Sequence, residues 1–263
     1  MLDYDVMDAN STRNQILNIF LLKGLVREKR HWGDFYGVMR STFPEANIIG
    51  LDYPGVGEKN EIISPRNFKA YVEDMRKEYA HCFDGKQENT LVAISLGGMM
   101  ARQWMELYPD DFKNCVLMNT SFKGICPIHK RLQPQSMKTF LKLFVTRNRD
   151  EVERGILEMV SNRKDKHPPI LKKWIEYQRE RPVSHKSFIN QITAALTYNA
   201  SKEKPKPKLL IMAGKKDRLC HYSCSEKIHQ AWGGKLEMHP EAGHDLAIDS
   251  TEWTAQTIKN FIG

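Results

Sequence analysis

Short apolar runs that alternate with helical patterns are the feature of this 263-residue chain that most restricts its fold. Strands that alternate with helices along a sequence generally pair in parallel, with helices covering both faces of the sheet. The alternation therefore predicts an α/β fold with a mostly parallel sheet of about six strands flanked by helices, open to one added antiparallel edge strand. The predicted strands are residues 15–22, 46–52, 90–94, 114–118, 207–213 and 234–239.

One helix is marked both at its start and along its buried face. The run Ser64-Pro65-Arg66-Asn67-Phe68 is typical of a helix start, and we predict Ser64 as the capping residue. We assign the apolar stripe that follows to the core and to no function. Its members recur at helical spacing, at Phe68, Val72, Met75, Tyr79 and Phe83.

Residues 122–206 break the alternation. They hold helical patterns near 134–146, 149–162, 168–180 and 184–199, but no convincing strand. We predict a helical insertion over 122–206, with residues 1–121 and 207–263 forming the core. The alternative is that these helices simply extend the core.

Ser95 lies where a strand pattern ends and a helical pattern begins, in the run Leu91–Met100. A sharp strand-to-helix turn at a serine strains the backbone and exposes the hydroxyl above the sheet. Small residues two positions before and after the serine let strand and helix approach each other, and here these are Ala93 and Gly97. The pattern A-x-S-x-G indicates a nucleophile, although similar runs also end ordinary strands.

Two later loops supply an acid and a base. Asp217 follows the predicted strand 207–213, and His244 follows the last predicted strand after a glycine. The chain order Ser, Asp, His differs from the orders in the chymotrypsin and subtilisin classes. Asn119 occupies another position where an acid could lie, but it carries no charge. Asp245 is the remaining alternative, although it adjoins the histidine and would point away from the ring.

With these residues in this order, the chain resembles the α/β-hydrolase superfamily. It looks most like the small single-domain branch of carboxylesterases and BioH-type carrier-protein methyl esterases. Lys23-Gly24-Leu25 stands where that superfamily usually has His-Gly-x, and the run from Asp52 to Gly57 looks like its D-x-P-G-x-G loop. The usual histidine helps to hold the oxyanion loop, so the replacement by Lys23 leaves open how this loop is fixed.

The resemblance carries further expectations. It implies that residues 122–206 are a helical lid inserted after the sixth strand of the superfamily fold. Too few residues precede 15–22 for the two-stranded hairpin that often starts this fold. The backbone N–H groups of Leu25 and Leu96 would form the oxyanion hole. No metal or organic cofactor is expected.

The expected chemistry is acyl transfer to water. His244 would take the proton of Ser95 during attack on an ester or thioester of a small or medium acyl substrate, with Asp217 orienting the ring. Two alternatives stay open: hydrolysis or lysis of a C–C bond by the same triad, and a non-catalytic binding protein of the same fold.

Composition bounds the partners and the compartment. Residues 122–208 hold 20 Lys and Arg against 8 Asp and Glu, which is either a solvated surface or a site for an anionic partner such as an acidic acyl carrier. The scattered lysines resemble no nucleic-acid module. No apolar run reaches membrane length, and five cysteines without metal spacing suit the cytoplasm. We interpret Cys220 and Cys224 as packing residues.

Overall fold

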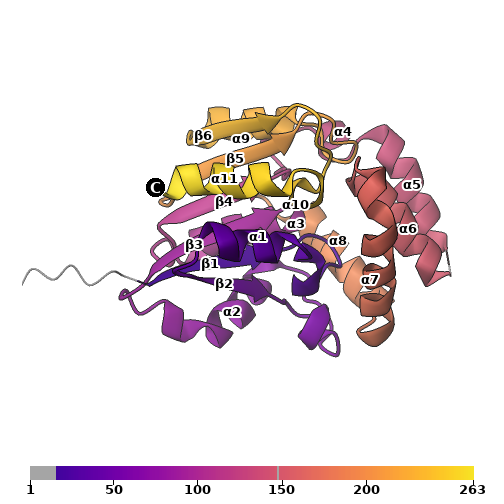
Figure 1. The fold of residues 1–263 in the computed structure, drawn as a ribbon, viewed down its shortest axis with the longest axis horizontal. Helices are drawn as coiled ribbons and strands as arrows, with labels where there is room; N and C mark the ends of the chain where they lie inside the picture. Colours follow the sequence, from indigo (N-terminus) through magenta and orange to yellow (C-terminus); the bar gives the residue numbers. More distant parts are fainter. Residues whose placement is uncertain (1–15, 147) are drawn as a thin grey trace, which may run out of the picture.

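Parallel strands form one sheet in the computed structural model, which describes residues 16–146 and 148–263 (Figure 1). Its spatial order is β2-β1-β3-β4-β5-β6. The predicted parallel α/β sheet is confirmed, and the described residues contain no antiparallel edge strand. Residue 15, the predicted start of the first strand, lies outside them. The strands are β1 Leu17–Leu22, β2 Ala46–Leu51, β3 Glu88–Ile94, β4 Asn114–Met118, β5 Lys208–Gly214 and β6 Lys235–His239.

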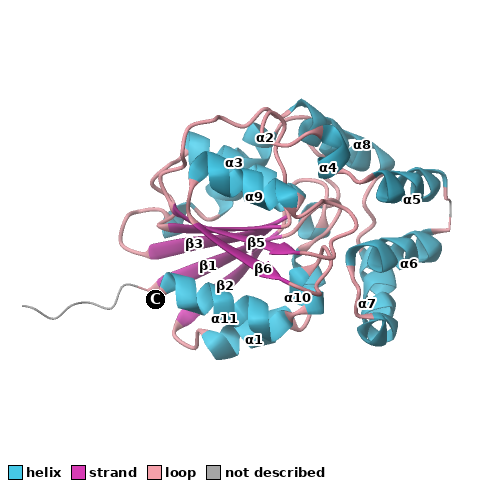
Figure 2. Ribbon diagram, turned by 90° about the horizontal axis from the view of Figure 1, so that it is seen from above, coloured by secondary structure: helices cyan, strands magenta, loops and turns pink. Residues whose placement is uncertain are grey.

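Helices cover both faces of the sheet (Figure 2). Alternate residues of β1 show the division, because successive side chains of a strand point to opposite faces. Ile19 and Leu21 share a buried cluster with residues of the helices on one face, whereas Phe20 and Leu22 share one with residues of the helices on the other. The first face carries α1 Phe35–Thr42 and α11 Thr251–Ile262, and the second carries α2 Phe68–Glu78, α3 Leu96–Leu107 and α9 Ser223–Trp232.

The prediction that Ser64 caps a helix is wrong. Helix α2 is capped by Asn67, whose side chain accepts a hydrogen bond from the Ala70 N–H at 3.1 Å. The Ser64 hydroxyl instead donates to the Pro54 carbonyl at 2.8 Å, so it fixes a loop beside the sheet. The predicted core stripe is confirmed for Phe68, Val72 and Met75, which are buried. Tyr79 and Phe83 lie past the end of α2 and are partly buried against the same core.

The segment between β4 and β5 is helical. Figures 1 and 2 show these helices grouped beyond the carboxyl ends of the strands, where the loops of the sheet also converge. The described part of residues 122–206 has one isolated β-bridge, between Lys123 and Asn199, and no strand. The helices are α4 Ile128–Arg131, α5 Pro134–Val145, α6 Arg149–Val160, α7 His167–Glu180 and α8 His185–Thr197, and the short α10 Leu246–Asp249 follows β6.

The cysteines are buried and unbridged. Cys220, in the loop that follows β5, and Cys224, in α9, pack with Cys126 in a small buried cluster. This placement agrees with a packing role.

Candidate active site

Ser95 occupies the turn between β3 and α3. Its backbone has φ 56° and ψ −122°, a left-handed conformation that costs free energy for any residue with a side chain. The neighbouring helix packs so closely that a Cβ at Gly97 would lie 2.5 Å from the Lys23 carbonyl oxygen. The glycine is therefore required for the turn. Ser95 itself is half-buried, so its side chain is accessible from solvent.

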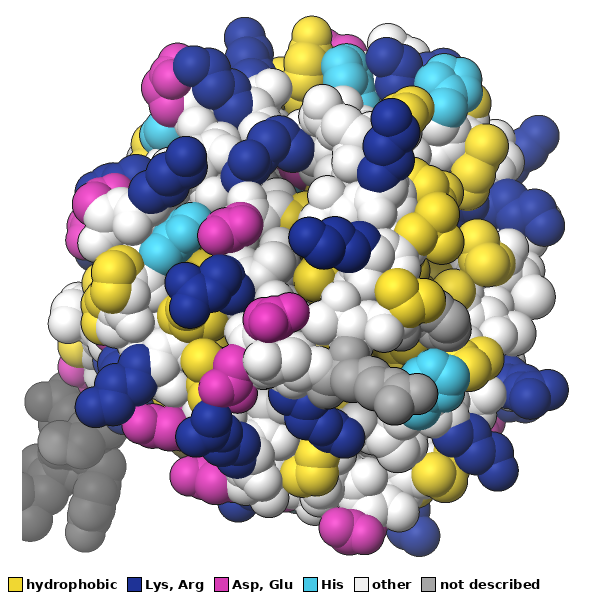
Figure 3. All heavy atoms as spheres, turned by 90° about the vertical axis from the view of Figure 1, so that its right-hand side faces the viewer, with side chains coloured by type: hydrophobic (Ala, Val, Ile, Leu, Met, Phe, Trp, Pro, Cys, Tyr) yellow, Lys and Arg dark blue, Asp and Glu magenta, His cyan; other side chains and the backbone are white. Residues whose placement is uncertain are grey.

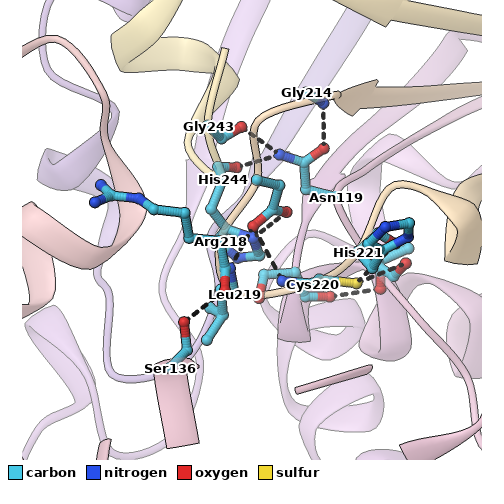
Figure 4. Close-up of polar contacts among 12 residues, drawn as sticks. Asn119, Ser136, Gly214, Arg218, Leu219, Cys220, His221, Gly243 and His244 are labelled. Atoms are coloured by element: carbon cyan, nitrogen blue, oxygen red, sulfur yellow. Dashed lines mark hydrogen bonds and ion pairs between the residues drawn. The ribbon is translucent and has the colours of Figure 1, made fainter. Parts of the chain in front are cut away.

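Asp217 and His244 are in direct contact at the ends of β5 and β6. Asp217 Oδ2 lies 2.7 Å from His244 Nδ1, and both residues are buried. Asp217 Oδ1 accepts hydrogen bonds from the N–H groups of Leu219 and Cys220 at 2.7 and 3.0 Å. Figure 4 shows Leu219 and Cys220 in the loop beside His244. These bonds fix the carboxylate plane, so that one oxygen remains for the imidazole.

This contact governs the protonation of His244. Burial by itself lowers the pKa of the ring, but the charge and hydrogen bond of Asp217 outweigh it, and the net pKa of His244 is raised above its usual value. Because Nδ1 faces the carboxylate, it carries the proton in the neutral ring. Nε2 is then the atom left to act as a base.

Asn119 holds the histidine loop and is a residue that sequence reasoning undervalued. Its side-chain nitrogen donates to the carbonyl oxygens of Gly243 and His244 at 2.9 and 2.6 Å. Its side-chain oxygen accepts from the Gly214 N–H at 2.9 Å, so one buried amide joins the ends of β4, β5 and β6 (Figure 4). Asn119 was considered only as an uncharged stand-in for an acid. Its position directly after a predicted strand is the signal that the sequence offers. The structure shows a positive φ of 44° there, which Asn tolerates better than most residues.

The same turn relates Ser95 to His244. Thr120, which follows Asn119, donates from its hydroxyl to the Ser95 carbonyl oxygen at 2.7 Å. Two consecutive residues after β4 thus bind the two backbones: Asn119 binds that of His244, and Thr120 binds that of Ser95. Within the described residues the Ser95 hydroxyl makes no hydrogen bond to the His244 ring. Such contacts are often long before substrate binds.

The predicted oxyanion loop adjoins the serine. A Cβ at Gly24 would lie 3.0 Å from Ser95 Cβ and 3.5 Å from Ser95 Oγ, so the loop passes directly over the hydroxyl. The N–H groups of Leu25 and Leu96 have no hydrogen-bond acceptor in the part of the chain that the structure describes. Leu96 is the first residue of α3, where N–H groups lack partners within the helix.

Two contacts that the sequence did not suggest hold this loop. The Tyr53 hydroxyl donates to the Gly24 carbonyl oxygen at 2.6 Å, and the Val26 N–H donates to Gln191 Oε1 of α8 at 2.9 Å. Val26 has φ 52°, which is strained for a β-branched residue. Among the described residues, the non-glycine residues with positive φ are Val26, Ser95 and Asn119, and all follow strands of this site. Strain of this kind concentrates at functional sites.

Asp245 does not contact the His244 ring nitrogen that Asp217 holds. Its Oδ2 instead lies 2.6 Å from Lys23 Nζ, in a buried ion pair. Within the described residues, no cluster of three or more His, Cys, Asp or Glu side chains is arranged to hold a metal ion. None of the helices there combines the length and apolar character that crossing a bilayer requires.

The fold has extensive structural counterparts. An esterase from Exiguobacterium antarcticum superposes with a TM-score of 0.76 at 19% identity, over 94% of this chain and 92% of that chain. A thermophilic esterase from Thermogutta terrifontis gives 0.72 at 17% identity, over 94% and 90%. A lipase-esterase related protein from Clostridium acetobutylicum gives 0.70 at 16% identity, over 94% and 95%. The sheet, its flanking helices and the loops at its carboxyl edge thus have the α/β-hydrolase fold.

Sequence comparison narrows this class. Residues 42–251 match the family model described as serine aminopeptidase, S33. The chain therefore belongs to this family of α/β-hydrolase enzymes. No curated protein shows significant sequence similarity to it.

Proposed function

We propose that the protein is a serine hydrolase that cleaves an ester or thioester of a small or medium acyl substrate. Ser95 is the nucleophile, His244 the general base and Asp217 the acid that orients the base. One observation supports this most strongly: the strained Ser95 turn and the buried Asp217–His244 pair lie at the ends of strands in one sheet, joined by the residues after β4.

The reaction proceeds in two displacements. His244 Nε2 takes the Ser95 proton as the hydroxyl attacks the acyl carbon, and the resulting imidazolium then gives that proton to the leaving alkoxide or thiolate. Water next attacks the acyl-enzyme, with His244 accepting its proton and returning it to Ser95. Asp217 stabilises the imidazolium at each stage and keeps the proton of the neutral ring on Nδ1.

The tetrahedral oxyanion is held by the backbone N–H groups of Leu25 and Leu96. Neither has a competing acceptor among the described residues; Leu96 directly follows Ser95, and Leu25 follows Gly24, which lies against the Ser95 side chain. In comparable enzymes, loss of one such donor costs about 3 kcal/mol of transition-state stabilisation. Tyr53 and Gln191 supply the loop support that the superfamily usually obtains in part from a histidine.

Residues 122–206 act as the cap in this proposal. The start of α5 contacts the acid loop directly: Gln133 Nε2 donates to the Asp217 carbonyl oxygen at 2.7 Å, and the Ser136 hydroxyl donates to the Arg218 carbonyl oxygen at 2.6 Å. Leu157 and Trp174, two of its apolar residues, pack against Ile248 of the core. The cap is thereby positioned by the same loops that carry the acid and the base.

The basic charge of this segment favours an acyl group delivered on an acidic carrier. Figure 3 shows the cap side of the molecule with many Lys and Arg side chains distributed over it. Hydrophobic side chains are exposed between them, including Leu141 and Val145 of α5. A summed positive field of this kind steers an anionic partner toward the site.

A substrate panel tests the proposal. Neutral esters, thioesters and carrier-bound acyl groups of graded chain length are compared with an aminoacyl anilide, because the family description names an aminopeptidase. Hydrolysis of esters or thioesters that is lost in Ser95→Ala supports the proposal. Activity on the anilide alone, or on C–C substrates alone, would mean that the enzyme cleaves that bond and not an ester or thioester. Absence of any covalent labelling by a fluorophosphonate would favour a non-catalytic binding protein.

A further inference from the structure

Lys23 and Asp245 form a buried ion pair between the two loops that carry the proposed reaction. Lys23 Nζ lies 2.6 Å from Asp245 Oδ2, and the side chains are only 2% and 9% exposed. Lys23 directly precedes Gly24 and Leu25 of the oxyanion loop, and Asp245 directly follows His244. The two residues are 222 positions apart in the chain, so only the fold brings them together.

This pair is poorly suited to a purely stabilising role. Burying two charges costs several kcal/mol per ion, and the mutual attraction repays this only when the other polar atoms are also satisfied. Asp245 Oδ1 is buried and has no hydrogen-bond partner among the described residues. The Lys23 ammonium packs over the Trp32 ring at 4.4 Å, and burial lowers the pKa of Lys23 although Asp245 opposes this. An apolar pair of the same volume would serve packing at least as well.

The charges nearest His244 come from three elements. Asp217, after β5, and Asp245, after β6, both raise the pKa of His244, while burial and Lys23, after β1, lower it. Arg27 lies beyond Lys23 and is paired with Glu153 at 2.9 Å.

His31 is a further buried histidine near Lys23, and its Nε2 lies 3.4 Å from Arg27 Nη1. Burial, then Arg27 and Lys23, hold the pKa of His31 well below its usual range, so its ring is neutral. At His244, by contrast, the opposite charges of Lys23 and Asp245 shift the pKa of the ring in opposite directions.

We infer that Lys23 and Asp245 are a matched pair of positioning residues, each cancelling the field of the other at His244 so that the ring responds chiefly to Asp217. The inference rests on the proposed function, in which His244 must be neutral to act as a base. Lys23, which stands in place of the usual histidine, would then influence the pKa of His244 in addition to forming part of the oxyanion loop.

The pH dependence of fluorophosphonate labelling tests the inference without knowledge of the natural substrate. The second-order labelling rate rises as His244 loses its proton, so its midpoint reads the pKa of His244. In Asp245→Asn the midpoint should fall by about 0.5 to 1 unit, and in Lys23→Met it should rise by a similar amount. In the double variant Lys23→Met/Asp245→Asn the midpoint should return close to that of the wild type. A role in packing alone predicts no such opposition.

Controls separate electrostatics from damage to the fold. Arg76→Met and Asp111→Asn break an ion pair with a 2.7 Å contact, and Asp111 precedes the amino end of β4, away from the loops that carry the acid and the base. These variants should lose stability in thermal unfolding but keep the wild-type midpoint. If Lys23→Met alone fails to fold, Asp245→Asn and the double variant still decide the question.

Two negative outcomes are distinguishable. If Ser95→Ala keeps its activity and labelling, the proposed function fails and this inference with it. If Ser95 is labelled in every variant but the midpoint stays fixed, or moves in the same direction in both single variants, the ion pair has no such role and the proposed function stands.

Discussion

Asp217 and His244 are joined by a 2.7 Å contact between Oδ2 and Nδ1, and the other carboxylate oxygen is held by two backbone N–H groups. The geometry leaves the carboxylate no alternative partner and the imidazole one free nitrogen. In the proposed mechanism Asp217 orients His244 and stabilises its charged form, whereas His244 takes part in every proton transfer. The two residues should fail unequally when they are replaced.

His244→Ala should reduce kcat nearly as much as loss of Ser95, because no other group accepts the proton. Asp217→Asn removes charge and tautomer control but keeps the shape, and should reduce kcat by about 10⁴-fold. Steady-state kinetics on the best ester of the panel measure both effects. His129→Ala and Asp165→Asn, at exposed positions of the cap, are the matched controls. Wild-type kinetics in Asp217→Asn would assign the acid to another residue.

Activity should depend on pH with a raised midpoint. Since Asp217 raises the pKa of His244 above the ordinary value of about 6.5, kcat/KM should rise with pH and reach half its maximum above that value. The raised pKa of His244 also contributes stability that is fully present below its unfolded pKa and is lost as pH rises through its folded pKa. Activity and this share of stability should change in opposite directions. A midpoint below pH 6.5 would contradict the assignment.

Tyr53→Phe should impair the oxyanion loop with little effect on the fold. The substitution removes the hydroxyl that donates to the Gly24 carbonyl oxygen, so the Leu25 N–H is less firmly placed. We expect kcat to fall about tenfold with a smaller change in KM, because displacement of a catalytic group acts on the transition state. Tyr71→Phe removes a similar hydrogen bond, to the Pro65 carbonyl oxygen, and should leave kcat unchanged. If both changes lowered kcat equally, the loss of activity in Tyr53→Phe would come from reduced stability and not from displacement of the Leu25 N–H.

The carrier hypothesis predicts a specific salt dependence. The Debye length falls from about 30 Å at 0.01 M to about 8 Å at 0.15 M ionic strength. Over that range kcat/KM should fall for a carrier-bound acyl group and stay level for a neutral ester of the same chain. Replacing Lys172 and Lys173 by Gln should reduce the fall, while replacing Lys69 and Lys77 of α2 should not. If kcat/KM depended equally on salt for both substrates, the positive charge of residues 122–206 would serve solubility and not carrier binding.

Much of the fold could be predicted from local patterns. Buried parallel strands are continuous apolar runs, so all six strands were placed within a few residues of their observed ends. The sequence locates the loops after β5 and β6 because Gly214 ends β5 and Gly243 lies in the loop that follows β6. The fold brings Asp217 and His244 of these loops into contact. The sequence also locates the helices of residues 122–206, but periodicity alone does not show what they contact.

Contacts between distant residues that belong to no motif could not be predicted. The sequence shows Lys23 only as a replacement for the usual histidine and Asp245 only as an alternative acid. Neither local pattern indicates that the two side chains meet. Gln191 reaches the oxyanion loop from α8, and this depends on how the cap sits on the core. The wrong prediction that Ser64 is the N-terminal capping residue of α2 has the same origin. The Ser64 hydroxyl donates to the Pro54 carbonyl oxygen, and this contact with another loop competes with local capping.

Covalent labelling of Ser95 tests the central claim most directly. The wild-type protein is treated with a fluorophosphonate at a pH above the His244 midpoint, and the modified peptide is identified by mass spectrometry. We expect a single adduct on Ser95 that forms together with the loss of esterase activity. Ser95→Ala should be folded, unlabelled and slower by about three to six orders of magnitude, while Ser41→Ala on α1 should behave as wild type. An adduct on another serine, or a Ser95→Ala protein that keeps most of its activity, would contradict the account.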